Sequence, residues 1–135
     1  RPYRLVEGQG YAIVEPVGQD IDQPVMPGAQ VRFRASLRRK PPIWYENRLM
    51  DVAETLEFDQ LKIYVVTSEL QVEPGECIDM TKTPGGDYLG WFTLTVPVEL
   101  AGRSALVQVH FEDGMEPIHS LRFAVQVADA DGGAA

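Results

Sequence analysis

Three segments in the last third of the chain alternate apolar and polar residues, and this pattern constrains the fold most strongly. They cover Trp91–Val98, Ala105–Phe111 and Leu121–Val127. A period of two is typical of β-strands that bury one face and expose the other to water. The pattern therefore predicts a sheet that packs against a second sheet. The residues predicted to face inward are Phe92, Leu94, Val96, Val98, Ala105, Val107, Val109, Phe111, Leu121, Phe123, Val125 and Val127.

Earlier segments extend the same pattern. Gln30–Arg38 and Leu61–Ser68 alternate well and are predicted to be strands. Pro97 lies among the outward residues of 91–98, which predicts an edge strand there, because proline has no backbone N–H to donate to a neighbouring strand. A loop is predicted at Thr81–Asp87. Weaker strands are predicted at Arg4–Glu7, Tyr11–Glu15, Val72–Pro74 and Cys77–Met80.

These segments add up to seven to nine strands, which predicts an all-β fold, an antiparallel β-sandwich of immunoglobulin-like type. The stretch 41–60 is ambiguous. Pro41-Pro42 interrupts regular structure, and the apolar residues that follow have helical spacing, namely Leu49, Val52, Ala53 and Leu56. We expect a long excursion with one short helix, and a strand near its end is the alternative.

The length of 135 residues fits one domain, which we place at residues 1–127. Residues 128–135 (ADADGGAA) are small, acidic and glycine-rich, which predicts a flexible tail or a linker. The chain begins at Arg1 and not at Met, so we expect the native N-terminus to lie upstream. The compartment stays open, and an extracytoplasmic location, periplasmic or secreted, is slightly favoured over a cytoplasmic one.

The composition argues against several function classes. The net charge is −8, from 20 acidic and 12 basic residues, and such a surface repels nucleic-acid backbones and anionic membranes. No apolar run approaches the ~20 residues that span a bilayer. The single cysteine, Cys77, excludes an internal disulfide. We therefore expect no nucleic-acid ligand and no membrane insertion in this segment.

The two histidines are the first candidates for metal binding. His110 and His119 flank a predicted turn at 112–117. Matching the inward faces of the flanking strands pairs residue 107 with residue 121, which places the histidines on opposite faces. A β-bulge would bring them together, so a small metal-binding protein remains a further alternative. We predict no metal site and no cofactor.

Motifs for catalysis are weak. Cys77 lies between the acidic residues Glu76 and Asp79, which disfavour a reactive thiolate, so we predict a small core residue. No Gly-x-Ser-x-Gly motif is present, and the run Lys82–Gly86 lacks the spacing of a phosphate-binding loop. The acidic loops do not follow the EF-hand calcium pattern. We therefore predict no catalytic residues and no enzyme.

A basic cluster stands out in this acidic chain. Five of the twelve basic residues lie within 32–40, and three of them share the outward side of one strand. A solvated face with acidic cross-strand neighbours is one interpretation. The functional interpretation is a docking patch for an acidic protein surface or an anionic glycan. The candidate binding residues of the cluster are Arg32, Arg34, Arg38 and Arg39.

Aromatic residues at outward positions are the other candidates. Trp91 and Tyr64 fall on the polar sides of their strands, and Trp44 and Tyr45 follow the Pro-Pro corner. Aromatic and arginine side chains are enriched in interface hot spots. Trp91 and Tyr64 could also stack on sugar rings, or a covering loop could bury them.

The sequence therefore favours a non-enzymatic β-sandwich module that binds another protein, as part of a larger envelope or secreted chain. The expected surface combines the arginine strand face with Trp44 and Tyr45. A partner with an acidic surface is expected, or one that pairs with an edge strand. The alternative is a carbohydrate-binding module that uses the exposed aromatics. The oligomeric state stays open.

Overall fold

The computed structural model of the protein describes residues 3–6, 10–39 and 57–130. This part of the chain contains ten strands and one short 3₁₀ turn, and none of its helices is long and apolar enough to cross a membrane. The strands are β1 Tyr3–Val6, β2 Gly10–Pro16, β3 Gln30–Arg38, β4 Leu61–Val66, β5 Gln71–Glu73, β6 Cys77–Asp79, β7 Thr81–Lys82, β8 Tyr88–Thr95, β9 Ser104–Asp113 and β10 Glu116–Gln126, and the turn η1 is Val98–Leu100.

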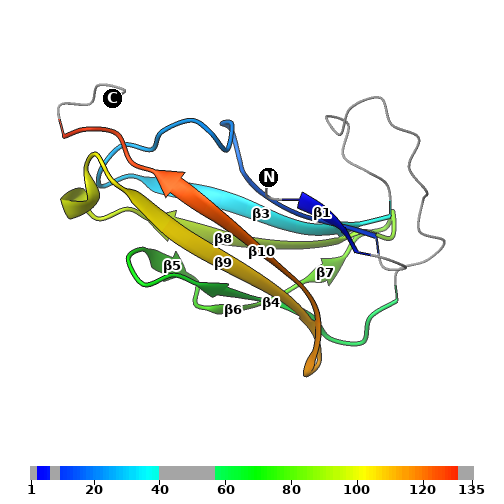
Figure 1. The fold of residues 1–135 in the computed structure, drawn as a ribbon. Helices are drawn as coiled ribbons and strands as arrows, with labels where there is room; N and C mark the ends of the chain where they lie inside the picture. Colours follow the sequence, from blue (N-terminus) through cyan, green and yellow to red (C-terminus); the bar gives the residue numbers. More distant parts are fainter. Residues whose placement is uncertain (1–2, 7–9, 40–56, 131–135) are drawn as a thin grey trace.

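The strands form two antiparallel sheets that pack against each other (Figure 1). The first sheet has the order β1-β2-β3-β8-β5, and β7 also pairs with β8. The second sheet has the order β10-β9-β4-β6. In Figure 1, β9 and β10, in gold and orange, pass across β3 and β8. The predicted all-β antiparallel sandwich is confirmed, and its immunoglobulin-like type stays a prediction.

One hydrophobic core fills the space between the sheets, because alternate residues of each sheet point toward the other. Phe33 of β3 stacks on Phe92 of β8 with 5.4 Å between ring centroids, and on Phe123 of β10 at 5.5 Å. Phe33 therefore joins the two layers. The predicted inward residues of β3, β9 and β10 are buried, namely Val31, Phe33, Ala35, Leu37, Ala105, Val107, Val109, Phe111, Leu121, Phe123 and Val125.

The prediction of an edge strand at Trp91–Val98 is wrong. β8 ends at Thr95 and pairs with β3 on one side and with β5 and β7 on the other, so it lies inside the sheet. Pro97 follows the strand and therefore interrupts no ladder. Val98, predicted to face inward, begins the 3₁₀ turn and is 61% exposed.

The segment Cys77–Lys82 passes from one sheet to the other. β6 pairs with β4 in the second sheet, and β7 pairs with β8 in the first. Met80 lies between them, is buried, and donates its N–H to the Leu61 carbonyl at 2.9 Å. Gly90 leaves room for it, since a Cβ added there would lie 3.2 Å from Met80 Cγ. The predicted loop at Thr81–Asp87 is therefore wrong for its first two residues. These two polar residues form a short strand, which their composition does not predict.

β9 and β10 form a hairpin whose turn has only two residues, Gly114 and Met115. Val107 consequently pairs with Phe123, so the predicted pairing of residue 107 with residue 121 is wrong by two residues. The tight turn accounts for one residue of this shift, since it pairs Asp113 with Glu116, and a β-bulge between Pro117 and His119 accounts for the other. A shift of two keeps each side chain on its predicted face, because the side-chain period is two.

The predicted helix in 41–60 lies mostly outside the described residues, and the described end of that stretch, residues 57–60, is irregular. At the other end of the chain, Val25 forms a parallel bridge with Val127, and Ala128 donates its N–H to the Val25 carbonyl at 2.8 Å. Ala128 is also buried. Packed structure at this end of the chain therefore includes Ala128.

Candidate functional site

The outward side of the first sheet brings together residues that the sequence suggested separately. Arg32 and Arg34 point outward because their neighbour Phe33 faces the core. Trp91 lies directly opposite Arg34 in the β3–β8 ladder, and Thr93 lies opposite Arg32. A predicted basic patch and a predicted stacking aromatic therefore share one surface.

We call this surface the Arg–Trp face. It consists of three rows of outward side chains, set by the ladders that join β2, β3, β8 and β5. Neighbouring strands lie about 4.8 Å apart, so adjacent members of a row are within side-chain reach. The first row is Glu15, Arg34 and Trp91, the second is Arg32, Thr93 and Glu73, and the third is Gln30, Thr95 and Gln71.

The centre of the Arg–Trp face is a stack of guanidinium groups on an indole. The Cζ atom of Arg32 lies 4.6 Å from the centroid of the Trp91 ring, and that of Arg34 lies 5.8 Å from it. Both distances fall within the roughly 6 Å of a cation–π attraction. Trp91 is half-buried and Arg32 is exposed. The stack therefore orders Arg32 while leaving its guanidinium open to a ligand.

Glu15 holds the second guanidinium of the stack. Its Oε1 accepts a hydrogen bond from Arg34 Nη2 in a close ion pair, and the two side chains are 33% (Arg34) and 24% (Glu15) exposed. Arg34 Nε is buried and has no hydrogen-bond partner among the described residues. In the same part of the chain, Arg32 has no carboxylate within ion-pair distance. Arg34 is thus the anchored arginine of the face, and Arg32 is the available one.

The other two predicted arginines lie at the end of β3, away from the Arg–Trp face. Arg38 Nε donates to Ser36 Oγ at 3.3 Å. The backbone N–H of Arg39 donates to Asp87 Oδ1 at 3.0 Å. Both arginines are half-buried. The predicted cluster is therefore divided into two regions along β3. Arg32 and Arg34 lie nearer its start, and Arg38 and Arg39 lie at its end.

Tyr64, the second predicted stacking residue, lies on the opposite outer face of the sandwich from Trp91. It belongs to β4 and points outward between Cys77 of β6 and His110 of β9. A hydrogen bond with Cys77 raises the pKa of Tyr64, and a charge interaction with Cys77 and desolvation add to this effect. Because the core separates the two faces, Tyr64 and Trp91 do not form one surface.

Cys77 is exposed, so the prediction of a core position is wrong. β6 has only three residues, and its buried member is Ile78, which pairs with Ile63 of β4. Alternation then turns Cys77 outward beside Tyr64. The apolar preference of cysteine predicted the opposite, because the sequence does not reveal the register of so short a strand.

The two histidines point to opposite faces of the second sheet. His110 lies on the outer face, where its Nδ1 is 2.6 Å from Ser120 Oγ. His119 pairs with Phe111, which is fully buried, and so lies on the face toward the core. Alternation therefore separates the two imidazoles that a shared metal ion would need on one face.

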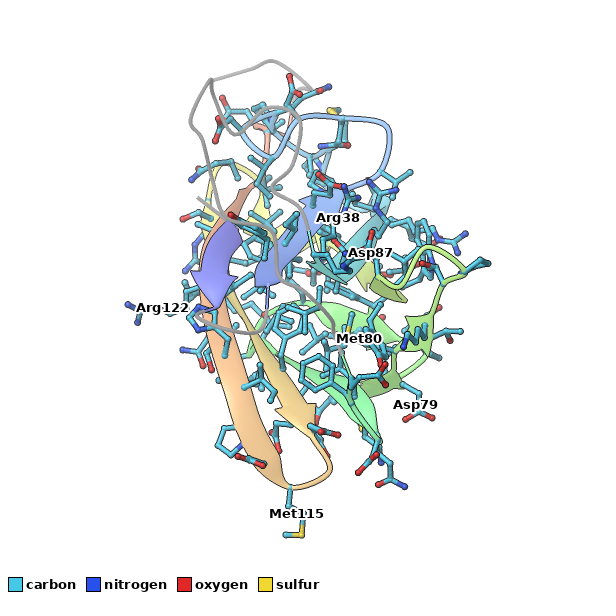
Figure 2. The ribbon with its side chains drawn as sticks, turned by 90° about the vertical axis from the view of Figure 1, so that its right-hand side faces the viewer. Arg38, Asp79, Met80, Asp87, Met115 and Arg122 are labelled. Carbon is cyan, nitrogen blue, oxygen red and sulfur yellow. The ribbon has the colours of Figure 1, made fainter. Side chains whose placement is uncertain are left out.

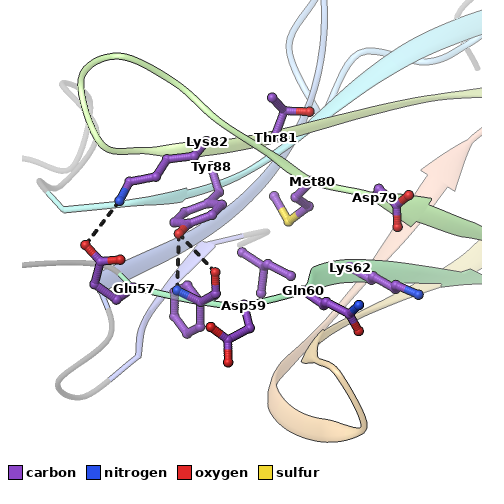
Figure 3. Close-up of a pocket in the computed structure, with 11 residues that line it drawn as sticks. Glu57, Asp59, Gln60, Lys62, Asp79, Met80, Thr81, Lys82 and Tyr88 are labelled. Carbon is purple, nitrogen blue, oxygen red and sulfur yellow. Dashed lines mark hydrogen bonds and ion pairs between the residues drawn. The ribbon is translucent and has the colours of Figure 1, made fainter.

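A pocket of about 570 Å³ lies at the end of the sandwich where the chain crosses between the sheets (Figure 3). Lys82 Nζ lies 3.2 Å from Glu57 Oε1, and the Tyr88 hydroxyl accepts a hydrogen bond from the Phe58 N–H at 3.1 Å. Its charged residues are mixed in sign, namely Glu57, Asp59, Lys62, Asp79 and Lys82. No histidine, cysteine or serine is among the described lining residues.

The acidic members of the Arg–Trp face were not predicted from the sequence. Acidic cross-strand neighbours of the arginines were one interpretation of the sequence, and Glu15 is such a residue. Its pairing with Arg34 was not predicted. Glu73 belongs to a three-residue strand whose register has no signal in the sequence. Trp44 and Tyr45, predicted to join the surface, lie outside the described residues.

Comparisons with known proteins leave the function to be argued from the structure. No protein-family model matches the chain, and a search of curated proteins finds no significant match.

Proposed function

We propose that the protein is a non-enzymatic β-sandwich module that binds another protein through the Arg–Trp face. The observation that carries the proposal is the stack of Arg32 on Trp91, on the exposed side of a sheet. Arginine and tryptophan are the side chains most enriched in binding hot spots. Here the β3–β8 ladder holds them side by side before any partner arrives.

The stack lowers the entropic cost of binding. Ordering a flexible side chain at an interface costs about 0.5–1.5 kcal/mol. Arg34 is already held by Glu15 and by the indole, and Arg32 lies against the same indole. A partner therefore meets donors that are ordered in advance, and more of the contact free energy contributes to affinity.

The expected partner presents a carboxylate to Arg32. A guanidinium offers a planar fork of donors that matches a carboxylate in a bidentate contact. The net charge of −8 repels an acidic partner at long range, so recognition depends on the local charge at this face. Binding should therefore be sensitive to the sign of the charge at position 32.

Carbohydrate binding is less well supported. A sugar stacks on an open aromatic ring, whereas Arg32 and Arg34 both lie against the Trp91 ring. Tyr64 belongs to the other outer face and cannot complete a sugar site with Trp91. A metal protein built on His110 and His119 is also less well supported, since their side chains point to opposite faces.

Affinity capture from the native extract tests the proposal with four forms of the chain: wild type, Arg32→Glu, Trp91→Ala and Arg122→Glu. Arg122 is exposed on the outer face of the second sheet and provides a control of equal charge change (Figure 2). We expect a protein that wild type and Arg122→Glu retain equally. Arg32→Glu and Trp91→Ala should each reduce its retention about 10-fold, the effect of losing one hot-spot contact.

Circular dichroism and melting temperature establish that all four forms are folded. Equal retention of the same proteins by every form would contradict the proposal. Loss of retention with Arg122→Glu alone would contradict it as well, because the binding surface would then lie on the second sheet.

A further inference from the structure

We infer that one partner of the Arg–Trp face is a second copy of this chain, docked face to face. The inference rests on the proposed function, because it names a partner for the same surface. Arg32 and Glu73 lie in one row, on the two sides of Thr93. Both are exposed, and in the described part of the chain they are not paired with each other. The face thus carries two oppositely charged side chains that do not form an ion pair with each other within one copy.

A twofold axis that runs above β8 and parallel to it exchanges the two sides of this row. β3 and β5 flank β8 at equal strand spacings of about 4.8 Å. Rotation about the axis places Arg32 of one copy over Glu73 of the second copy, and the reverse contact forms at the same time. Each dimer therefore gains two ion pairs, as expected of an isologous interface in which every contact occurs twice.

The neighbouring rows are compatible with the same axis. Gln30 and Gln71 flank Thr95, so the rotation brings one amide over another, and each amide can both donate and accept a hydrogen bond. In the first row, Trp91 belongs to β8 and lies beneath the axis, where Arg32 and Arg34 of its own copy lie against its ring.

An axis across the strands is disfavoured by charge. Such an axis places β3 of one copy over β3 of the other. If it passes over the first row, Arg34 opposes Arg34, and if it passes over the second row, Arg32 opposes Arg32. Midway between these rows, Arg32 opposes Arg34. Like charges in direct opposition are destabilising, so the charge pattern selects the axis along β8.

We expect the dimer to be weak. The face has nine outward side chains per copy, fewer than the roughly 20–30 residues a side of a stable interface. The net charge of −8 on each copy also opposes association when the salt concentration is low. We expect a weak dissociation constant, roughly 10 μM to 1 mM.

Sedimentation velocity of the chain from about 10 μM to 1 mM, in about 0.15 M salt, tests the inference. We expect the wild-type sedimentation coefficient to rise with concentration. Arg32→Glu and Glu73→Arg should each weaken association at least about 10-fold, because like charges then face each other. The double variant Arg32→Glu/Glu73→Arg should restore association to within about threefold of wild type, since the pair is rebuilt with its signs exchanged. Arg122→Glu should associate as wild type does.

The outcomes separate this inference from the proposed function. A wild-type chain that stays monomeric throughout overturns self-association, whereas the capture experiment, performed at low concentration, still decides whether the face binds another protein. A dimer that survives both single substitutions overturns the inference, because the contact then lies elsewhere. Loss of the dimer in the single variants without recovery in the double variant overturns the Arg32–Glu73 pairing.

Discussion

The two outer faces of the sandwich arise from the same strand alternation, yet they organise their polar side chains differently. On the first sheet, two arginines stack on one indole, and one of them is also held by a carboxylate. On the second sheet, a row crosses all four strands, and its side-chain contacts are pairwise, between Tyr64 and Cys77 and between His110 and Ser120.

Alternation decides which residues reach the surface, whereas side-chain length and charge decide whether they act together. Arg32 and Arg34 are long enough to meet on Trp91 from two rows of the sheet. The side chains of Cys77 and Ser120 are short and reach only their immediate neighbours. We therefore propose a binding role for the first face and none for the second.

Both outer faces are supported by one hydrophobic core, which should unfold cooperatively. Phe33→Ala tests this and should have the largest effect on stability. Phe33 stacks on Phe92 in its own sheet and on Phe123 of the other sheet. Its truncation should lower the free energy of unfolding by about 3–5 kcal/mol, measured by urea titration. Met115→Ala is the control, because Met115 is 95% exposed, and it should change the value by less than about 0.5 kcal/mol. Separate transitions for the two sheets would contradict a shared core.

The next largest effect on stability is expected for a substitution beside the segment that crosses between the sheets. Gly90→Ala should cost about 1–3 kcal/mol, because the new Cβ would lie 3.2 Å from Met80 Cγ in the packed core. Gly75→Ala is the matched control, since a Cβ at Gly75 meets nothing within 4 Å. Thermal unfolding of both variants measures the difference. Equal melting temperatures would contradict the prediction, because Met80 would then be able to move away from the added Cβ at no cost.

Glu15→Gln sharpens the contrast between the faces at smaller scale. The ion pair of Glu15 with Arg34 is partly exposed and therefore screened, so its loss should cost about 0.2–1 kcal/mol. Glu112→Gln, a matched change on the outer face of the second sheet, should cost less, because Glu112 has no ion pair among the described residues. Urea titrations at about 0.1 M and 1 M salt measure both variants. A Glu15→Gln cost that stays constant at high salt would argue against an electrostatic origin.

The smallest predicted effect concerns the second face. Cys77→Ala should lower the pKa of Tyr64 toward its ordinary value, because the hydrogen bond with Cys77 is the main cause of the raised pKa. A raised pKa means that the folded state holds the phenolic proton more tightly. Its contribution to stability is therefore complete below about pH 10 and is lost as pH rises through the folded pKa.

Ultraviolet absorbance of tyrosinate during an alkaline titration measures this shift. Tyr64→Phe is the control. Without the Tyr64 phenol, replacing Cys77 with alanine should no longer change the titration curve. Identical titration curves for wild type and Cys77→Ala would contradict a contact between the two side chains.

Strand faces were largely predictable from the sequence, whereas strand positions were not. The inward residues of β3, β9 and β10 follow from a period of two, and the structure buries them. The place of β8 inside its sheet depends on β5 and β7, which have three and two residues. Segments this short carry no periodic signal, so the sequence around Pro97 wrongly predicts an edge strand.

The candidate site was predictable in its parts and not in its assembly. The outward positions of Arg32, Arg34 and Trp91 follow from alternation within single strands. Their contact depends on the register between β3 and β8, which are separated by about fifty residues of chain that include other strands. Glu15 and Glu73 join the face only through two further registers.

The amino-acid pattern alone predicts that the protein is built of strands with one buried face, and which side chains of the longer strands reach water. That information is local, because the pleat of a strand alternates its own side chains. Three further features follow only from the folded arrangement: Arg32 stacks on Trp91, Tyr64 lies on the other side of the core, and Cys77 is exposed. The physical reason is that pairing between distant strands is set by the packing of the whole core and by tight turns, which no single segment encodes.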